Sequence, residues 1–570
     1  MEKELGSALG EPIGIVGNES RPGIVEVVSR HPLPLGTYVA IPFSSRDPST
    51  GREKRHLLVG VVSSTMYRRT VPVSGAAALA TSGLYAEFEN ELAQYGASLV
   101  RAVADVGSDG AVSVPRTPPP PNAPVYLAPS PVLSKLFSRG GEDCVRIGHL
   151  VGRDDVEVRV SVDALAKHLF ITGTTGSGKS NTVAILIDRI ASIGGMVIVY
   201  DVHGEYSSLS PESPSVRVET IDLYVNPLVV APKMLSKMIV PEASATVQRR
   251  LVERGLREAQ KLFSEIIDKH GITPRAVEEA RSRLASIRAR QSSLASDASE
   301  DIGENLDAME ALAELFREAV ISSIRRICGR GQSKAFSERS CEAAVAKVEE
   351  FFEYTPISFR RGSPVELLAP RTIVVLNASS LDDEQRDYML KLVADELLWF
   401  GRRNALMGTP KPVVLVIEEA HLFLSSNRES ASRRSIERLA REGRKFGVCL
   451  FIVSQRPRNI DSNTVSQVQN FVFMKLVQEA DQRAVMNASD MLTEDLASSL
   501  STMDTGEALL VGEWIGRFPA FVKIDRHGGK RAGATPRISE LWRSLAREME
   551  RGEELGEIHE AALEDLKGLV

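Results

Sequence analysis

The chain has 570 residues, too many for one hydrophobic core, so two to four domains are expected. Hydrophobic residues at 43% and charged residues at 25% are typical of globular proteins, and no apolar run approaches the ~18 residues that cross a bilayer. The first residues, MEKELGSALGEP, lack the basic and apolar pattern of a secretory signal. We therefore expect a cytoplasmic protein without a membrane partner.

The net charge of −6 is unevenly distributed. Residues 425–458 hold nine basic and three acidic side chains, whereas residues 548–570 hold eight acidic and two basic ones. This asymmetry fits a focal binding surface for DNA phosphates, although a solvated basic helix would show the same charges. The four cysteines, without CxxC spacing, argue against a zinc cluster or a disulfide framework; they are Cys144, Cys328, Cys341 and Cys449.

Residues 1–155 alternate short β-rich runs with Gly and Pro turns, which predicts a small antiparallel barrel. Four consecutive prolines at 118–121 favour a stiff connection in or beside it. From residue 156 onward, apolar strands alternate with helices, as in a doubly wound, mostly parallel sheet. The predicted strands are 168–172, 196–200, 372–377, 413–418, 448–454 and 471–476, and the clearest helices 179–193, 384–401 and 432–446.

An insertion divides this α/β core. Residues 232–365 are rich in Ala, Glu, Arg, Leu and Lys with apolar spacing near 3.6, which predicts a helical bundle. The core is thus expected in two parts, 156–231 and 366–530. A helical tail is expected at 531–570.

Residues 173–180 read GTTGSGKS, match G-x-x-x-x-G-K-[ST], and lie between an apolar strand and a helix. Backbone N–H groups of such a loop cradle phosphates, the lysine reaches the β- and γ-phosphates, and the serine hydroxyl binds Mg²⁺. A glycine-rich turn without a ligand is the competing interpretation. The predicted ATP-binding residues are Gly173, Thr174, Thr175, Gly176, Ser177, Gly178, Lys179 and Ser180.

The strand VVLVI is followed by Glu418 and Glu419 at the edge of the sheet where ligands bind in open α/β folds. We expect Glu418 to help hold Mg²⁺ and Glu419 to orient the attacking water. Two surface glutamates starting a helix would be the simpler explanation. The extra strand between the phosphate loop and Glu418 resembles the RecA-like branch of P-loop ATPases, in which Gln455 would be a sensor of the γ-phosphate.

The order of barrel, GTTGSGKS, DVHGEY, helical insertion, VVLVIEEAHLF, REGRKFG and VSQRP resembles the HerA family of DNA translocases. That resemblance implies a HAS-like barrel, a homo-hexamer on double-stranded DNA, the nuclease NurA as partner and a functional link to Mre11 and Rad50. It makes Arg444 an arginine finger, although a helix-terminal cation is its plainer role. Asp201, His203 and Glu205 fall on a family motif without individual roles.

In a RecA-like ring, the loops at 425–434 and 456–466 face the central hole. Their arginines are expected to hold phosphates, and the loops carry no aromatic residue for stacking on single-stranded bases. The candidate DNA-binding residues are Arg428, Arg433, Arg434, Arg456 and Arg458.

The predicted function is an ATP-dependent DNA translocase or helicase, active in DNA end resection and double-strand break repair. A coupling ATPase of conjugation or secretion is the first alternative, although such proteins commonly carry a membrane anchor. A protein-remodelling ring is the second, which aromatic pore loops would favour. ATP and Mg²⁺ are the expected cofactors in all three cases.

Overall fold

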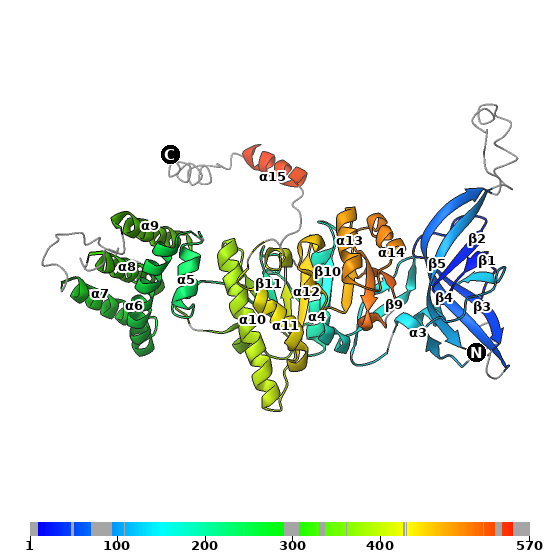
Figure 1. Ribbon diagram of the computed structural model, residues 1–570, viewed down its shortest axis with the longest axis horizontal. Coiled ribbons are helices and arrows are strands. Elements are labelled where there is room, and N and C mark those ends of the chain that lie inside the picture. Colours follow the sequence, from blue (N-terminus) through cyan, green and yellow to red (C-terminus); the bar gives the residue numbers. More distant parts are fainter. Residues whose placement is uncertain are drawn as a thin grey trace.

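A computed structural model describes residues 9–46, 51–69, 94–529 and 538–550, apart from short gaps at 108, 139, 243, 290–306, 330–336, 361, 426–427, 429 and 517. The described chain is elongated (Figure 1). A helical bundle lies at one end, a mixed sheet with its helices occupies the middle, and a β-barrel lies at the other end.

Six strands close the predicted N-terminal barrel in the order β2-β1-β7-β3-β4-β5, with β5 pairing back to β2. Closure leaves no unpaired strand edge around the barrel. Its interior is a small apolar core that includes Val25, Val39 and Ile41. The strands are β1 (Gly14–Ser20), β2 (Ile24–Ser29), β3 (Tyr38–Arg46), β4 (Glu53–Arg69), β5 (Gln94–Gly107) and β7 (Pro124–Leu127), with β6 (Val112–Ser113) beside β5.

The barrel packs against the rest of the molecule through the outer face of β3. Successive side chains of a strand point to opposite faces. Val39 therefore packs inside the barrel, whereas Tyr38 and Ala40 belong to the large core that continues into the central sheet. The Tyr38 hydroxyl also accepts a hydrogen bond from the backbone N–H of Phe521 at 3.1 Å.

The central sheet has eleven strands in the order β12-β13-β11-β14-β15-β10-β16-β17-β18-β8-β9. Neighbours from β12 to β16 are parallel, and those from β16 to β9 are antiparallel. The predicted strands are β10 (Leu169–Thr172), β11 (Met196–Asp201), β13 (Thr372–Asn377), β14 (Val413–Ile417), β15 (Val448–Ser454) and β16 (Asn470–Phe473). The others are β8 (Cys144–Leu150), β9 (Arg153–Ser161), β12 (Arg217–Asp222), β17 (Glu507–Gly512) and β18 (Ala520–Ile524).

The expected domain boundary at residue 155 does not fit the sheet. It falls inside β9, and β8 and β9 are joined to the central sheet, with Val522 of β18 opposite Leu150. The short helix α3 (Ser130–Phe137) separates them from the barrel and was not predicted. Short antiparallel strands carry an alternating pattern that does not reveal which sheet they enter, so the sequence placed this hairpin in the barrel.

The helices of the core are α4 (Lys179–Ser192), α10 (Asp383–Leu406), α11 (Arg433–Glu442), α12 (Ser462–Val465), α13 (Glu479–Ala488) and α14 (Glu494–Ser499). Helix α10 begins with a capping box in which Asp382 and Gln385 exchange hydrogen bonds. The predicted helix 432–446 is α11 followed by the 3₁₀ turn η4 (Gly443–Phe446). A Cβ on Gly443 would lie 2.8 Å from the Val448 carbonyl oxygen, so a larger residue would push η4 away from β15.

The insertion consists of α5 (Pro232–Ile239), α6 (Thr246–His270), α7 (Pro274–Ala289), α8 (Ala308–Gly329) and α9 (Glu338–Tyr354). Its core contains Phe263, Phe316 and Phe359, whose rings lie 5.1 to 6.1 Å apart. A disulfide joins Cys328 of α8 to Cys341 of α9, a pairing that the argument against a disulfide framework did not foresee. Their separation of 13 residues gave no sign that α8 and α9 bring them together.

Within the predicted C-terminal tail, the structure describes α15 (Ile538–Glu550), and residues 551–570 lie outside the described chain. No helix in the described part of the chain is long and apolar enough to span a bilayer.

Candidate nucleotide site

The phosphate loop links β10 to α4 at the carboxyl edge of the sheet. Gly176 and Gly178 have φ of +76° and +107°, conformations that glycine adopts without strain. A Cβ on Gly173 would lie 2.7 Å from both the Met474 Cβ and the Ser177 Oγ. The loop is held from outside, because the Thr174 N–H donates to the Lys475 carbonyl at 2.8 Å. The sequence motif therefore adopts the tight turn that its glycines predict.

Lys179 is the first residue of α4, and its side chain turns back under the loop. Its Nζ donates hydrogen bonds to the carbonyl oxygens of Gly173 at 2.8 Å and Thr174 at 3.0 Å. Burial lowers the pKa of Lys179, while the nearby Glu419 and Glu418 carboxylates oppose that shift. The ammonium group is thus fixed at the centre of the loop, where a phosphate would meet it.

The turn DVHGEY is built around Asp201, which is fully buried at the end of β11. Its carboxylate accepts hydrogen bonds from the backbone N–H groups of His203, Glu205 and Tyr206 at 3.3, 3.1 and 2.8 Å. Burial raises the pKa of Asp201, and these backbone hydrogen bonds oppose the rise. The side chain of His203 is exposed. Asp201 thus shapes the turn that directs the side chains of Glu205 and Tyr206 into the site.

Glu205 and Tyr206 contact the two predicted metal ligands, Ser180 and Glu418. The Ser180 hydroxyl donates to Glu205 Oε2 at 2.6 Å, and the Tyr206 hydroxyl donates to Glu418. Loss of solvent raises the pKa of Glu418 to about 8, with the like charges of Glu205 and Glu419 adding to the rise against the hydrogen bond from Tyr206. Ser180 and Glu418 thus lie in one oxygen-rich cluster. Both Glu205 and Tyr206 belong to the DVHGEY motif, but the sequence assigned neither of them an individual role.

Hydroxyl and carboxylate oxygens are the donors that Mg²⁺ prefers. Burial raises the pKa of Glu418, the neighbouring carboxylates add to the rise, and a bound cation would favour the charged form of Glu418. The residues of this cluster therefore fit a magnesium ion.

Glu419 and Gln455 lie at the ends of β14 and β15, and they contact each other. Gln455 Nε2 donates to Glu419 Oε1 at 2.5 Å, and Gln455 Oε1 accepts from the Thr175 hydroxyl at 2.6 Å. Burial alone would raise the pKa of Glu419, but His421, Gln455 and Lys179 outweigh it and leave the pKa lowered. Glu419 is therefore held as a carboxylate beside the phosphate loop, connected to it through one amide side chain.

Arg444 lies at the opposite edge of the sheet. It is exposed in η4, which precedes β15, whereas Gln455 follows that strand. Seven residues of β15 separate the two edges by roughly 20 Å at about 3.3 Å per residue. The structure does not bring Arg444 to the nucleotide loop of its own chain.

The two predicted DNA loops are fastened to each other. Ser425 and Ile460 form an isolated antiparallel bridge, and Arg433 Nη2 donates to Asp461 Oδ1 at 2.7 Å. Arg433 therefore has a structural role between the loops. Arg458 donates to Gln478 at 2.9 Å, and Arg428 to Glu384 at 3.2 Å.

Arg434 and Arg456 are the two candidate DNA contacts that remain unengaged. Both are exposed, and neither side chain forms a hydrogen bond or an ion pair with another described residue.

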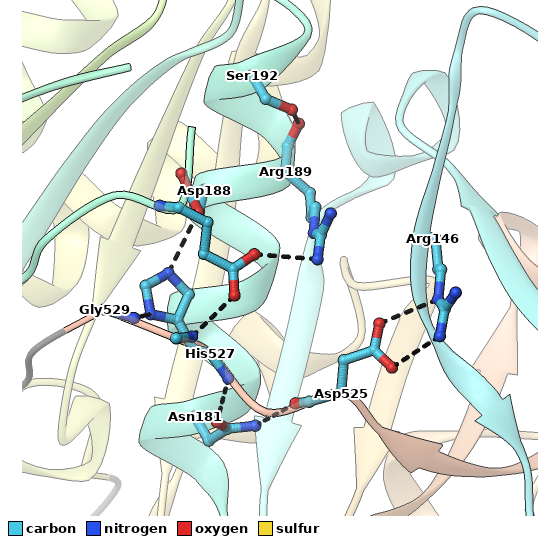
Figure 2. A network of polar contacts seen from close by, with 10 residues as sticks. Arg146, Asn181, Asp188, Arg189, Ser192, Asp525, His527 and Gly529 are labelled. Atoms are coloured by element: carbon cyan, nitrogen blue, oxygen red, sulfur yellow. Dashed lines mark hydrogen bonds and ion pairs between the residues drawn. The ribbon is translucent and has the colours of Figure 1, made fainter. Parts of the chain in front are cut away.

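A second network of polar contacts joins α4 to the segment that follows β18 (Figure 2). Asn181 donates to the Asp525 carbonyl at 2.7 Å and accepts from the His527 N–H at 3.0 Å. His527 Nε2 lies 3.2 Å from Asp188 Oδ2, and Arg146 binds both carboxylate oxygens of Asp525. These partners are more than 300 residues apart in the sequence, so no local pattern could reveal them. The network fixes the segment after β18 to the helix that carries Lys179 and Ser180.

Comparison with known proteins places this site in a family. Residues 145–397 match the family described as "Helicase HerA, central domain". The DNA double-strand break repair helicase HerA of Sulfurisphaera tokodaii is 36% identical over 447 residues, which cover 78% of this chain and 81% of that protein. The chain belongs to the HerA helicase family. The HerA protein of Sulfolobus acidocaldarius is 34% identical, over 77% of this chain and 80% of its own.

Among solved structures, the bacterial conjugative coupling protein TrwB overlaps with 72% of this chain and 94% of its own at a TM-score of 0.42 and 12% identity. This likeness is too weak to assign a function. HerA membership, by contrast, confirms the family that the motifs resembled and the α/β fold with its barrel and insertion.

The contact of Gln455 with Glu419 and Thr175 can be tested by substitution. Gln455→Glu would place a carboxylate against Glu419, raising its pKa and removing its hydrogen-bond donor. We expect ATP hydrolysis to fall roughly 10²- to 10³-fold, with nucleotide binding changed only a few-fold. Steady-state ATPase assays and titration with a fluorescent nucleotide measure the two effects. Gln469→Glu, an exposed glutamine before β16, is the matched control, and equal activity of the two variants would contradict the role of Gln455.

Proposed function

We propose that the chain is an ATP-driven motor that moves along double-stranded DNA during double-strand break repair. The contact between Gln455, Glu419 and Thr175 carries the proposal, because one side chain joins the phosphate loop, the candidate catalytic glutamate and a DNA loop. The related proteins of Sulfurisphaera tokodaii and Sulfolobus acidocaldarius are named DNA double-strand break repair helicases.

ATP supplies the free energy, and Mg²⁺ neutralises charge on the transferring phosphoryl group. The loop N–H groups and Lys179 bind the phosphates, while Ser180, Glu205 and Glu418 hold the ion. Glu419, kept ionised by its neighbours, accepts a proton from the attacking water. Gln455 keeps that carboxylate in place.

Hydrolysis would reach the DNA through the two loops that begin beside these groups. The segment 425–434 follows β14 and Glu419, and the segment 456–466 follows Gln455. The Ser425–Ile460 bridge and the Arg433–Asp461 ion pair join them, so they move as one unit. A change of contacts at the γ-phosphate therefore shifts both loops together.

The loops favour phosphate contacts over base contacts. Arg434 and Arg456 are exposed, and residues 425–434 and 456–466 contain no aromatic side chain. Arginine binds phosphate oxygens without reading sequence, whereas proteins that track single strands commonly stack bases on aromatic rings. This composition supports duplex DNA as the track.

The position of Arg444 supports a ring of subunits, which we infer to be a homo-hexamer. A guanidinium supplied by a neighbour stabilises charge on the phosphoryl group in many such enzymes. Arg444 lies roughly 20 Å from its own nucleotide loop across β15. It can therefore act only on a site in another copy of the chain.

The barrel lies at the end of the molecule opposite the helical insertion (Figure 1). None of its strands contributes a side chain to the nucleotide site described above. We infer that it docks the nuclease NurA, in a process linked to Mre11 and Rad50.

Co-sedimentation of the intact chain with NurA measures this docking. We expect a complex that survives loss of ATP binding in Lys179→Ala. An intact protein that fails to bind NurA at micromolar concentration would contradict the docking.

The translocase proposal predicts which polymer accelerates hydrolysis. We expect duplex DNA to stimulate ATPase activity more than single strands, because the loops offer phosphate contacts without stacking. The assay compares no polymer, single strands, duplex and unfolded protein at several salt concentrations. Equal rates with and without DNA would contradict a translocase, and stimulation by unfolded protein alone would favour a remodelling ring.

The trans role of Arg444 predicts complementation between two inactive variants. Arg444→Ala should bind ATP normally and lose roughly 10³-fold in kcat, because the charge on the neighbour's phosphoryl group loses its partner. Subunits of Arg444→Ala and Glu419→Gln are dissociated, mixed and reassembled, and mixed rings are verified by mass spectrometry. Interfaces that combine an intact Arg444 with an intact Glu419 should recover hydrolysis. Full activity of Arg444→Ala alone, or inactive mixed rings, would contradict the assignment.

A further inference from the structure

A groove of about 1410 Å³ lies where the helical insertion meets the core. Helices α5 and α10, Arg428 and residues 430–438 line it, with α10 between α5 and α11 (Figure 1). Pockets for small molecules typically enclose about 300–1,000 Å³. The size of the groove therefore suits a stretch of polymer better than a metabolite.

The acidic side chains that line the groove are already engaged within its walls. Each of them binds a cation or polar groups of a neighbouring segment: Glu384 with Arg428, Asp387 with residues 430–432, Asp395 with Lys391, and Glu437 with Arg433. They contribute little free negative charge to the space between the walls.

Three cations of the lining remain without such a partner. Lys233 and Lys237 are exposed on α5, and Arg434 is exposed on α11. None of the three side chains forms a hydrogen bond or an ion pair with another described residue. Lys233 and Lys237 are four residues apart, so both lie on one face of α5. The groove thus presents unpaired positive charge from both the insertion and the core.

We propose that this groove binds the phosphate backbone of the DNA on which the motor moves, with α5 of the insertion as its second wall. The inference rests on the proposed function and extends the DNA contact beyond the two loops. Arg434 belongs both to the segment 425–434 and to the groove, so the two surfaces are continuous. Tyr388 is the one aromatic residue among the lining residues, which favours phosphates over stacked bases.

The assignment gives the insertion a function. Its aromatic core builds a rigid bundle, and the bundle holds α5 against the core. Lys233 and Lys237 thereby face the same space as a loop that follows Glu419. A DNA strand in the groove would contact α5, which is fixed, on one side. On the other side it would contact the loop after Glu419, which responds to the nucleotide.

The test uses the full chain and a fluorescent duplex DNA of mixed sequence. The test variant is Lys233→Gln/Lys237→Gln. Each lost phosphate contact should reduce the slope of the logarithm of the DNA-binding constant against the logarithm of the salt concentration by about 0.9. Two lost contacts therefore reduce the slope by about 1.8 for every subunit on the duplex. Near 0.1 M salt the affinity should fall roughly ten- to sixtyfold for each subunit that contacts the duplex. The control is Lys261→Gln/Lys411→Gln, two exposed lysines outside the groove with the same loss of charge.

Two further readouts make the result decisive. Lys233→Arg/Lys237→Arg should restore the slope, and thermal unfolding should show that all variants are folded. Equal slopes for the groove variant and the control would overturn the groove assignment while leaving the proposed function in place. A groove variant with raised ATPase activity and an unchanged slope would also overturn it, and would point to an acidic protein segment as the occupant. An unaltered protein that binds no duplex overturns both proposals.

Discussion

The arrangement of the ATPase core depends on one buried ammonium group and the carboxylates around it. Lys179 is near Glu205, Glu418 and Glu419, whose charges partly offset the cost of removing its ammonium group from water. These side chains come from segments that follow β10, β11 and β14, so the charges can meet only if those strands end at one edge. The strand order β11-β14-β15-β10 meets this condition, because parallel neighbours deliver their carboxyl ends side by side.

The same edge explains how a chemical event could become movement. Gln455 follows β15, which lies between β14 and β10, and its amide spans from Glu419 to Thr175. The segments that leave this edge then form the two joined loops that we propose to contact DNA, and one wall of the groove. The insertion and the barrel lie at opposite ends of the sheet (Figure 1), so the nucleotide site lies between the two additional domains.

Local patterns predicted the phosphate loop and the strands of the parallel sheet, since continuous apolar runs and glycine spacing encode both directly. Strand β12 was missed because it is an edge strand with a largely polar surface. Three other features depend on contacts between separate segments, which no local pattern encodes. They are the pairing of β8 and β9 with the central sheet, the Cys328–Cys341 disulfide and the ion pair of Arg433 with Asp461. Glu205 and Tyr206 were visible as a motif, but their roles required the turn around Asp201.

Displacement of a third DNA strand from a triplex tests the central claim, that ATP hydrolysis moves the protein along an intact duplex. The fluorescent third strand is bound far from the free duplex end, and its release is followed over time. ATP should drive release by the unaltered protein, whereas Lys179→Ala or a non-hydrolysable ATP analogue should give none. Duplex-stimulated hydrolysis without any release of the third strand would contradict the claim.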